Sequence, residues 1–235
     1  PSGLLYLAAV LEKNGEEVRL LDMKALRPDI SDKQKFYVDT LIKTISDFNP
    51  GIIGFGCLFS GNFLDVLRLS VVCKERFSKI PILAGGIHFT IYAEKILENC
   101  PSIDGVFLGE AEESIVKLVE TIKSRRFELD KIDGFAYRNN GKLQVNPKSN
   151  FIKNIDNIPF PAYNLINIKD YYVDTSHWHN PKKLPINTSL PIISSRSCPY
   201  RCTFCSMYTV MGPHWRGRSA KNVVDEIEYL YNTYN

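Results

Sequence analysis

The first half of the chain alternates between two hydrophobic patterns. Apolar residues every three or four positions, as at Leu41, Ile45 and Phe48, predict amphipathic helices. Short continuous apolar runs, several of them ending in glycine, predict buried strands. In chain order the patterns predict helices over 2–15, 31–50, 62–77, 90–100 and 111–124, and strands over 16–23, 51–56, 80–86 and 103–110.

This alternation determines the predicted fold class. Strands that are separated by helices do not form hairpins, so the sheet is expected to be parallel. The order lacks only a leading strand, and we expect the chain to be a segment of a longer protein. With that strand restored, the fold is α/β, a flavodoxin-like, Rossmann-like doubly wound parallel sheet, whose ligands bind beyond the carboxyl ends of the strands.

Three predicted strands end in glycine-containing turns. CLFSGN follows Gly56, GGIHFT follows Ala84, and GEAEES follows Leu108. Glycine allows close approach of a ligand to the backbone, although each turn alone is also typical of a tight strand-to-helix connection. Neither a G-x-G-x-x-G motif at a strand-to-helix turn nor a P-loop is present. The candidate ligand contacts at these strand ends are Ser60, Gly85, Gly86, His88, Thr90, Gly109 and Glu110.

The second half of the chain has a different pattern. We assign residues 1–125 to the Rossmann-like domain and residues 126–190 to a hairpin and linker. The hairpin is predicted around Asn139, Asn140 and Gly141, and the linker is rich in Pro, Asn and aromatic residues. Residues 191–235 are expected to begin a second domain, because a strand over 190–197, a cysteine-containing loop and a helix that starts after Ser219 form one βα unit.

Composition excludes several classes of protein. The chain is 44% hydrophobic and 23% charged with a formal net charge of +3, so charge alone does not indicate a nucleic-acid partner. No apolar run of about 18 residues predicts a membrane span, and no signal peptide is evident. Cys57, Cys73 and Cys100 lie in apolar segments and are predicted to be buried thiols, which favours a reducing, cytoplasmic location.

The other three cysteines are clustered in the sequence CPYRCTFC, where Cys198, Cys202 and Cys205 have the spacing C-x3-C-x2-C. Structural zinc sites have four ligands, commonly from two paired knuckles, and a disulfide would leave one thiol over. An iron–sulfur cluster fits the spacing better than zinc, a disulfide or unrelated buried thiols, because thiolates on one loop can surround a cubane. Three thiolates on a four-iron cluster leave one iron open.

The sequence CPYRCTFC after a predicted strand resembles the signature of the radical S-adenosylmethionine enzymes. The resemblance implies that the three cysteines bind a [4Fe–4S] cluster and that S-adenosylmethionine chelates the fourth iron. It also implies that Phe204 lies beside the adenine and that residues 191–235 begin a truncated partial TIM barrel. Arg216 and Arg218 are candidates to neutralise the carboxylate of S-adenosylmethionine or the charge of the cluster, with a solvated surface pair as the alternative.

Other segments resemble the subclass that has an N-terminal cobalamin-binding domain. They are GGIHFT, GEAEES, the hairpin GFAYRNNGK, the connector IPFPAYNLI and the stretch RGRSAKNVVDEIEYL. The resemblance implies that the strand-end residues hold the corrin and its nucleotide tail. The chain lacks D-x-H-x-x-G, the motif whose histidine ligates cobalt in the methionine-synthase type. His88 has a different spacing, so cobalamin is expected to bind without that lower ligand.

The resemblance therefore implies a cobalamin-dependent radical S-adenosylmethionine enzyme, with methyl transfer to an unactivated carbon as the leading reaction and cyclisation or rearrangement as others. The expected partners are a small-molecule or natural-product substrate and an external electron donor of the flavodoxin or ferredoxin type, with no membrane and no clear nucleic acid. Two alternatives stay open at this point: a cobalamin carrier or sensor, and an iron–sulfur electron-transfer protein.

Overall fold

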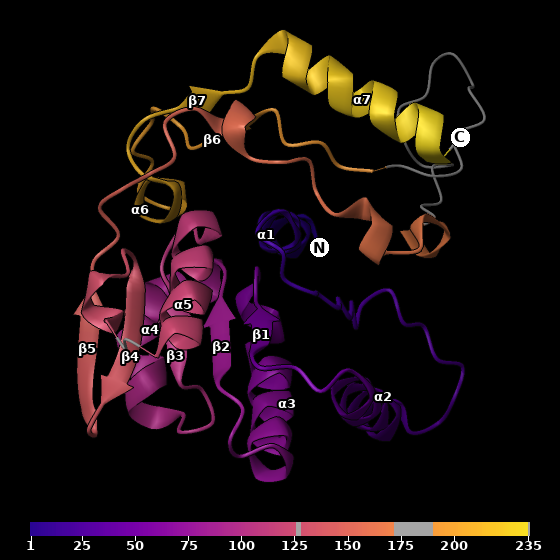
Figure 1. Cartoon of the computed structure of the whole chain (residues 1–235), viewed down its shortest axis with the longest axis vertical. Coiled ribbons are helices and arrows are strands. Elements are labelled where there is room, and N and C mark those ends of the chain that lie inside the picture. The colour runs from indigo at the N-terminus through magenta and orange to yellow at the C-terminus, as the bar shows by residue number, and fades with distance from the viewer. Residues whose placement is uncertain (126–127, 172–189, 235) are drawn as a thin grey trace.

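The apolar runs of the first half form the centre of a five-stranded sheet with the order β1-β2-β3-β4-β5 (Figure 1). The computed structural model describes residues 1–125, 128–171 and 190–234. β1, β2 and β3 are parallel, whereas β4 and β5 form an antiparallel hairpin at the edge beside β3. The strands are β1 (Ile53–Gly56), β2 (Ile82–Gly85), β3 (Gly105–Phe107), β4 (Phe135–Asn139) and β5 (Lys142–Asn146).

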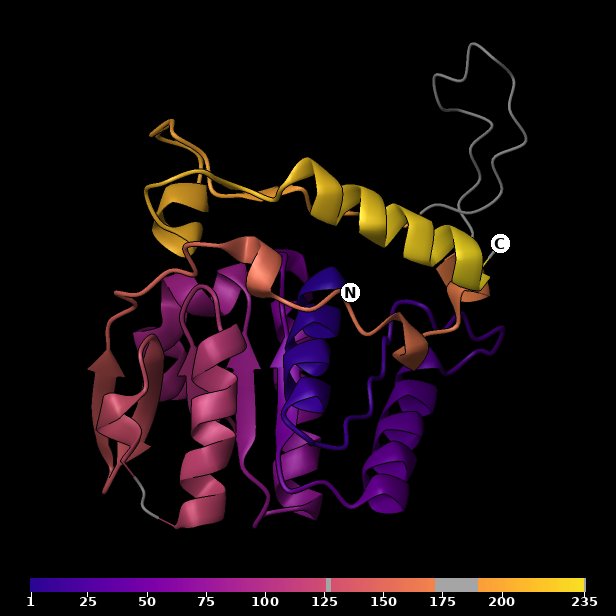
Figure 2. The same cartoon turned by 45° about the horizontal axis from the view of Figure 1, so that its top comes forward.

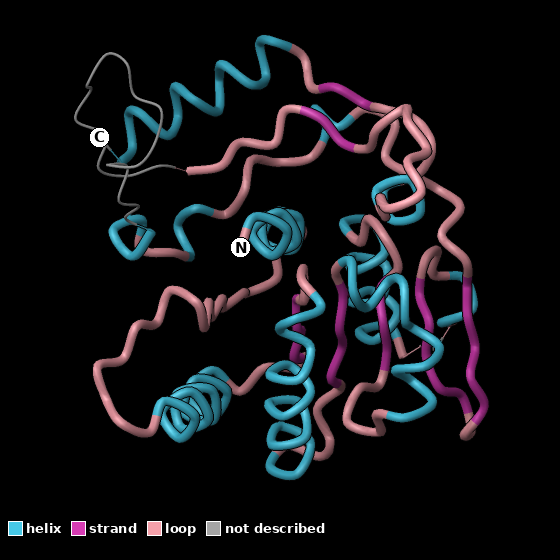
Figure 3. The backbone as a smooth tube through the Cα atoms, turned by 180° about the vertical axis from the view of Figure 1, so that it is seen from behind, coloured by secondary structure: helices cyan, strands magenta, loops and turns pink. Residues whose placement is uncertain are grey.

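Helices cover both faces of this sheet, because successive side chains of a strand point to opposite faces. Ile82 and Ala84 pack in one cluster with α2, α3 and α4, whereas Leu83 packs in another cluster with α1 and α5. The result is a three-layer α/β/α arrangement, as predicted (Figures 1 and 3). The helices are α1 (Ser2–Lys13), α2 (Lys33–Phe48), α3 (Phe63–Arg76), α4 (Ile87–Asn99) and α5 (Glu112–Ser124).

The strand predicted over residues 16–23 is wrong, because this segment has no regular strand structure. A strand persists only where its backbone groups bond to a neighbouring strand. β1 forms the edge of the described sheet, and among the described residues no strand pairs with its free side. Residues 16–23 therefore have the apolar pattern of a strand but no described neighbouring strand with which their backbone could pair.

The hairpin prediction is confirmed, and the strands of the first half are parallel as predicted, but the hairpin extends this sheet with two antiparallel strands, which the sequence did not predict. Asn139 pairs with Lys142, which leaves Asn140 and Gly141 as a two-residue turn with φ of 48° and 76°. β4 joins the sheet by pairing with β3. Arg138 of β4 also donates to the carbonyls of Leu97, Cys100 and Ile103, so it satisfies backbone groups at and after the end of α4.

After the hairpin, the described part of the predicted linker packs on α1 through short 3₁₀ turns. Ile155 and Ile158 lie in one cluster with Tyr6 and Val10 of α1. The remaining part of the linker prediction, residues 172–189, lies outside the described residues. The 3₁₀ turns of the described residues are η1 (Ser60–Asn62), η2 (Leu129–Lys131), η3 (Ile155–Asn157), η4 (Tyr163–Leu165) and η5 (Ile168–Tyr171).

The last segment lies over the carboxyl ends of the parallel strands (Figure 2). It consists of β6 (Ser195–Arg196), α6 (Met207–Met211), β7 (Arg216–Gly217) and α7 (Ala220–Tyr234). β6 is shorter than the strand predicted over 190–197, since only its last residues pair with β7. Ser219 caps α7 as predicted, because its hydroxyl accepts from the amide of Asn222. No described helix is long and apolar enough to cross a membrane.

The turn between β2 and α4 gives the first prediction. Gly86 has a φ of +100°, and a Cβ atom there would lie 2.4 Å from the carbonyl oxygen of Cys57. We expect Gly86→Ala to reduce the free energy of unfolding by about 1–3 kcal/mol, because it combines a disfavoured φ with a backbone clash. Urea titration measures the loss. Gly3→Ala is the matched control, since Gly3 lies in α1 with no atom within 4 Å, and an equal loss in both variants would contradict the assignment.

Candidate functional site

The three clustered cysteines lie on a loop that leaves β6 and returns through α6 to β7. Two kinds of contact close the base of this loop. Ser195 pairs with Gly217 and Arg196 with Arg216, and the hydroxyl of Ser197 donates to the carbonyl of Gly212. Ser197 has a φ of 66°, so the chain turns sharply immediately before Cys198. We define residues 197–215 as the cysteine loop.

The thiols themselves are accessible. Cys198 is half-buried, Cys202 and Cys205 are exposed, and all three are free. Phe204, the aromatic between them, is 90% exposed. Among the described residues, no group of three or more His, Cys, Asp or Glu side chains is arranged to hold a metal ion. This does not conflict with a cubane, since a cluster is ligated at separate irons and not at one ion, and free thiols on one loop fit that chemistry.

The predicted buried thiols are confirmed. Cys57, Cys73 and Cys100 are buried and free. Burial raises the pKa of the Cys73 thiol to about 11, and burial likewise raises the pKa of Cys57 and Cys100. Since the thiolate is the reactive form, these side chains are suited to packing and not to ligation.

Arg216 and Arg218 are not solvated surface residues. The side chain of Arg216 is 9% exposed and lies 2.8 Å from a carboxylate oxygen of Glu110. Arg218 pairs with Glu226, which also accepts from the hydroxyl of Tyr163 at 2.7 Å. Both guanidinium groups are thus engaged by protein carboxylates, and their role towards S-adenosylmethionine stays a prediction.

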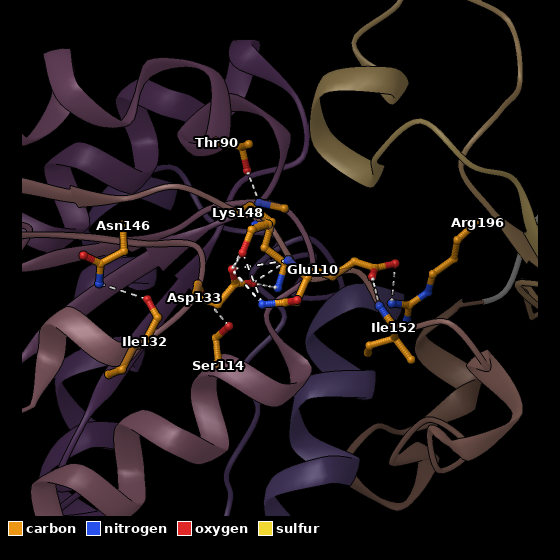
Figure 4. A network of polar contacts seen from close by, with 12 residues as sticks. Thr90, Glu110, Ser114, Ile132, Asp133, Asn146, Lys148, Ile152 and Arg196 are labelled. Atoms are coloured by element: carbon orange, nitrogen blue, oxygen red, sulfur yellow. Dashed lines mark hydrogen bonds and ion pairs between the residues drawn. The ribbon is translucent and has the colours of Figure 1, made fainter.

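Glu110 is the most deeply buried of the predicted strand-end residues, with a side chain only 1% exposed. Figure 4 shows this side chain beside Arg196 and Ile152. Its carboxylate accepts from Arg196, from Arg216 and from the amide of Ile152. Burial alone would raise the pKa of Glu110, but the hydrogen bonds and charges of the two arginines outweigh it and hold this pKa below its usual value. Glu110 is therefore an ionised, fully bonded group.

The remaining strand-end candidates form a more open rim. The Nδ1 atom of His88 lies 2.9 Å from the hydroxyl of Ser60, and the ring lies 4.5 Å from that of Phe63 and 4.9 Å from that of Tyr92. Burial lowers the pKa of His88, which favours the neutral imidazole. Thr90 donates to the carbonyl of Gly86 and accepts from the amide of Gly109. The structure therefore brings Ser60 together with His88, and Thr90 together with both glycines.

The glycines of this rim have different surroundings. A Cβ atom at Gly109, whose φ is +67°, would lie 2.6 Å from the carbonyl oxygen of Val210 in α6. Gly86 is equally crowded by Cys57, as described above. At Gly85 the nearest atom to such a Cβ would be 3.8 Å away, which is ordinary contact. Gly86 and Gly109 are thus required because the protein's own backbone lies close to them. At Gly109 the approaching backbone belongs to the cysteine loop.

The sequence patterns missed the apolar part of the rim. Leu58 and Phe59 are 56% and 61% exposed immediately after β1, and Tyr92 is exposed beside His88. The run from Cys57 to Phe59 was assigned to a turn. Only its apolar character at a predicted strand end could have identified it as part of a binding surface. Exposed apolar side chains next to polar ones are typical of a surface that binds a ligand. We define Leu58, Phe59, Ser60, His88 and Tyr92 as the rim cluster, which fits the apolar edge and amide side chains of a corrin.

Comparison with known proteins agrees with these features. The B12 binding domain family matches residues 1–119. The chain is 31% identical over 234 residues to the uncharacterized methyltransferase PH0819 of Pyrococcus horikoshii, and 30% identical over 274 residues to cytidylyl-2-hydroxyethylphosphonate methyltransferase of Streptomyces wedmorensis. These matches cover 100% of this chain but 46% and 49% of the relatives, so the chain spans about half the length of the curated relatives it matches.

Solved structures share the fold. OxsB, a cobalamin-dependent S-adenosylmethionine radical enzyme solved with aqua-cobalamin, has a TM-score of 0.74 at 20% identity, and the match covers 99% of this chain and 29% of OxsB. TsrM from Kitasatospora setae, solved with cobalamin and a [4Fe–4S] cluster, has a TM-score of 0.68 at 20% identity, over 99% of this chain and 43% of TsrM. The chain therefore belongs to the B12 binding domain family.

Proposed function

We propose that the enzyme containing this chain binds cobalamin at the rim cluster and a [4Fe–4S] cluster at the cysteine loop, and transfers a methyl group to a small molecule by radical chemistry. One observation carries the proposal. α6 of the cysteine loop approaches the carboxyl edge of the sheet so closely that only glycine fits at position 109. A cofactor held by the rim cluster and a cofactor held by the cysteine loop would therefore lie next to each other.

The chain's own residues have distinct roles in this proposal. Cys198, Cys202 and Cys205 would hold the cluster, with S-adenosylmethionine at the open iron and Phe204 beside its adenine. The apolar members of the rim cluster would cover the corrin and exclude water, and His88, held by Ser60, would stay neutral. When bound and reduced by the external donor, the cluster would supply the one electron needed for cleavage of S-adenosylmethionine to methionine and a 5′-deoxyadenosyl radical, and cobalamin would serve as the methyl carrier.

Names of relatives support methyl transfer but do not restrict the reaction to it. PH0819 and the Streptomyces wedmorensis protein are named methyltransferases, whereas a relative from Rubrivivax gelatinosus, 29% identical over 234 residues, is named an anaerobic magnesium-protoporphyrin IX monomethyl ester cyclase. We propose a small-molecule or natural-product substrate, an external one-electron donor of the flavodoxin or ferredoxin type, and a cytoplasmic location.

The decisive experiment is product analysis after anaerobic reconstitution with iron, sulfide and cobalamin. With dithionite and S-adenosylmethionine, the enzyme is expected to form 5′-deoxyadenosine. Uptake of cobalamin and the cluster without this product would contradict radical chemistry and favour the carrier or sensor alternative. Uptake of a cluster that leaves S-adenosylmethionine unbound would favour electron transfer.

The cysteine assignment gives a second prediction. Replacing Cys198, Cys202 or Cys205 with alanine is expected to abolish binding of about four iron and four sulfide per chain, because each thiolate holds one iron of the cubane. Iron and sulfide assays with visible absorbance measure the content. Cys100→Ala is the control, since this thiol is buried and should leave the content unchanged. Wild-type iron content in the three loop variants would remove the basis for the cluster.

The rim cluster gives a third prediction. Replacing Phe59 with serine is expected to weaken cobalamin binding about tenfold or more, because covering a large aromatic side chain contributes about 1.5–3 kcal/mol. Titration followed by the visible spectrum of cobalamin measures the dissociation constant. Val145→Ser is the control, since Val145 is also exposed but lies on β5 at the edge of the sheet. Equal affinities of both variants and the wild type would place cobalamin elsewhere.

A further inference from the structure

The guanidinium group of Arg216 is surrounded by protein acceptors. Its Nη1 atom donates to Glu110 and to the carbonyl of Ile152, both at 2.8 Å, and its Nη2 atom donates to the carbonyl of Met211 at 2.7 Å. Its Nε atom donates to the carbonyl of His214 at 3.3 Å. Arg216 thus connects the end of α6 and the root of β7 to a carboxylate of the sheet edge.

Glu110 contacts both roots of the cysteine loop. Arg196 belongs to β6, Arg216 belongs to β7, and the two residues are directly paired in register. One carboxylate oxygen of Glu110 accepts from Arg196 at 3.2 Å, and the other accepts from Arg216 and from the amide of Ile152. A single buried carboxylate therefore joins the two strands that flank the loop, and Figure 4 shows its contacts with Arg196 and Ile152.

The underside of the loop rests on the segment that follows β5. The ring of Phe151 lies 5.6 Å from the guanidinium carbon of Arg216, and a Cβ atom at Gly212 would lie 2.9 Å from that ring. Asp133 holds this segment in place, because it accepts from the amide of Ser149 at 2.8 Å and pairs with Lys148 at 2.9 Å (Figure 4). The base of the cysteine loop is therefore held by the segment that contains Phe151, whereas Cys202, Phe204 and Cys205 in its outer part are exposed.

We infer that Glu110 and Arg216 are positioning residues, a latch that orients the cysteine loop over the carboxyl edge of the sheet, and that neither contacts a cofactor. The inference rests on the proposed function, since the orientation matters because the loop would hold the cluster. A cofactor contact requires a free polar atom within reach of the ligand. Four of the five N–H groups of Arg216 donate to protein acceptors and its side chain is 9% exposed, while the Glu110 side chain is 1% exposed, so both groups are committed to protein contacts.

Two variants test the latch in cofactor-free protein. Glu110→Gln keeps the shape but removes the charge, and Arg216→Lys keeps the charge but cannot reach several acceptors that lie in different directions. Hydrogen exchange is measured at the amides of Cys205 and Val210, which bond to Cys202 and Ser206 within the loop. We expect exchange at both amides to be about tenfold faster or more in each variant, because a hydrogen bond to a charged group is lost.

Glu226→Gln is the matched control. Glu226 is another fully buried carboxylate that pairs with an arginine, but it lies on α7 and bonds to Arg218 and Tyr163. This variant should accelerate exchange in α7 and leave the amides of Cys205 and Val210 unchanged. Equal acceleration of these amides in all three variants would show general destabilisation and overturn the latch.

The reconstituted protein provides an independent measurement. At full iron content, the electron paramagnetic resonance signal of the reduced cluster is expected to broaden in Glu110→Gln and Arg216→Lys, because the loop adopts a wider range of orientations. Unchanged exchange in both variants, or a loss of affinity for S-adenosylmethionine without faster exchange, would overturn the inference and restore a ligand-contact role. If the wild-type protein binds neither the cluster nor cobalamin, the proposed function fails, whatever the variants show.

Discussion

The burial of Glu110 between Arg196 and Arg216 is the interaction on which the relation between the sheet and the cysteine loop depends. A carboxylate that is 1% exposed has lost its hydration, and only close, bonded cations compensate for that loss. The two arginines come from segments 86 and 106 residues further along the chain. Removing Glu110 would leave the guanidinium of Arg216 buried without its paired carboxylate, whereas Arg196 would keep its bond to Glu112. Loss of one partner from a buried ion pair typically costs about 3–5 kcal/mol. The sheet edge and the roots of the loop are therefore expected to become ordered together.

This arrangement divides the loop into a fixed base and an exposed outer part. The base is held by β6, β7, the contact of Ser197 with Gly212, and the ring of Phe151. The outer part carries two exposed thiols and an aromatic ring that is 90% exposed. Such a division suits a site that binds an inorganic cluster, because the ligands can adjust to the cluster while the direction of the loop is set by the protein.

The elements that the sequence predicted correctly are those determined by local pattern. Buried strands such as β2, the turn at Asn140 and Gly141, and the capping of α7 by Ser219 each depend on neighbouring residues. The failures involve distant partners. Residues 16–23 have the apolar pattern of a strand, but no described strand lies beside them to pair with. The pairing of β4 with β3 joins two segments that are separated by α5, and no local pattern indicates it. For the same reason the sequence could identify Glu110 and Arg216 as functional candidates, but it could not show that they bond to each other.

The exposed aromatic residues explain why the two proposed cofactor regions, the rim cluster and the cysteine loop, must be considered together. Phe204 and Tyr200 on the loop and Phe59 on the rim expose large apolar surfaces, which soluble proteins rarely gather without a binding partner. Neither region buries these surfaces in the described structure, and the close contact between Gly109 and Val210 brings α6 to the same edge of the sheet. Ligands that cover both surfaces would gain apolar burial from each. The affinity of one cofactor is then expected to depend on the presence of the other, since each cofactor would complete the wall of the other's site.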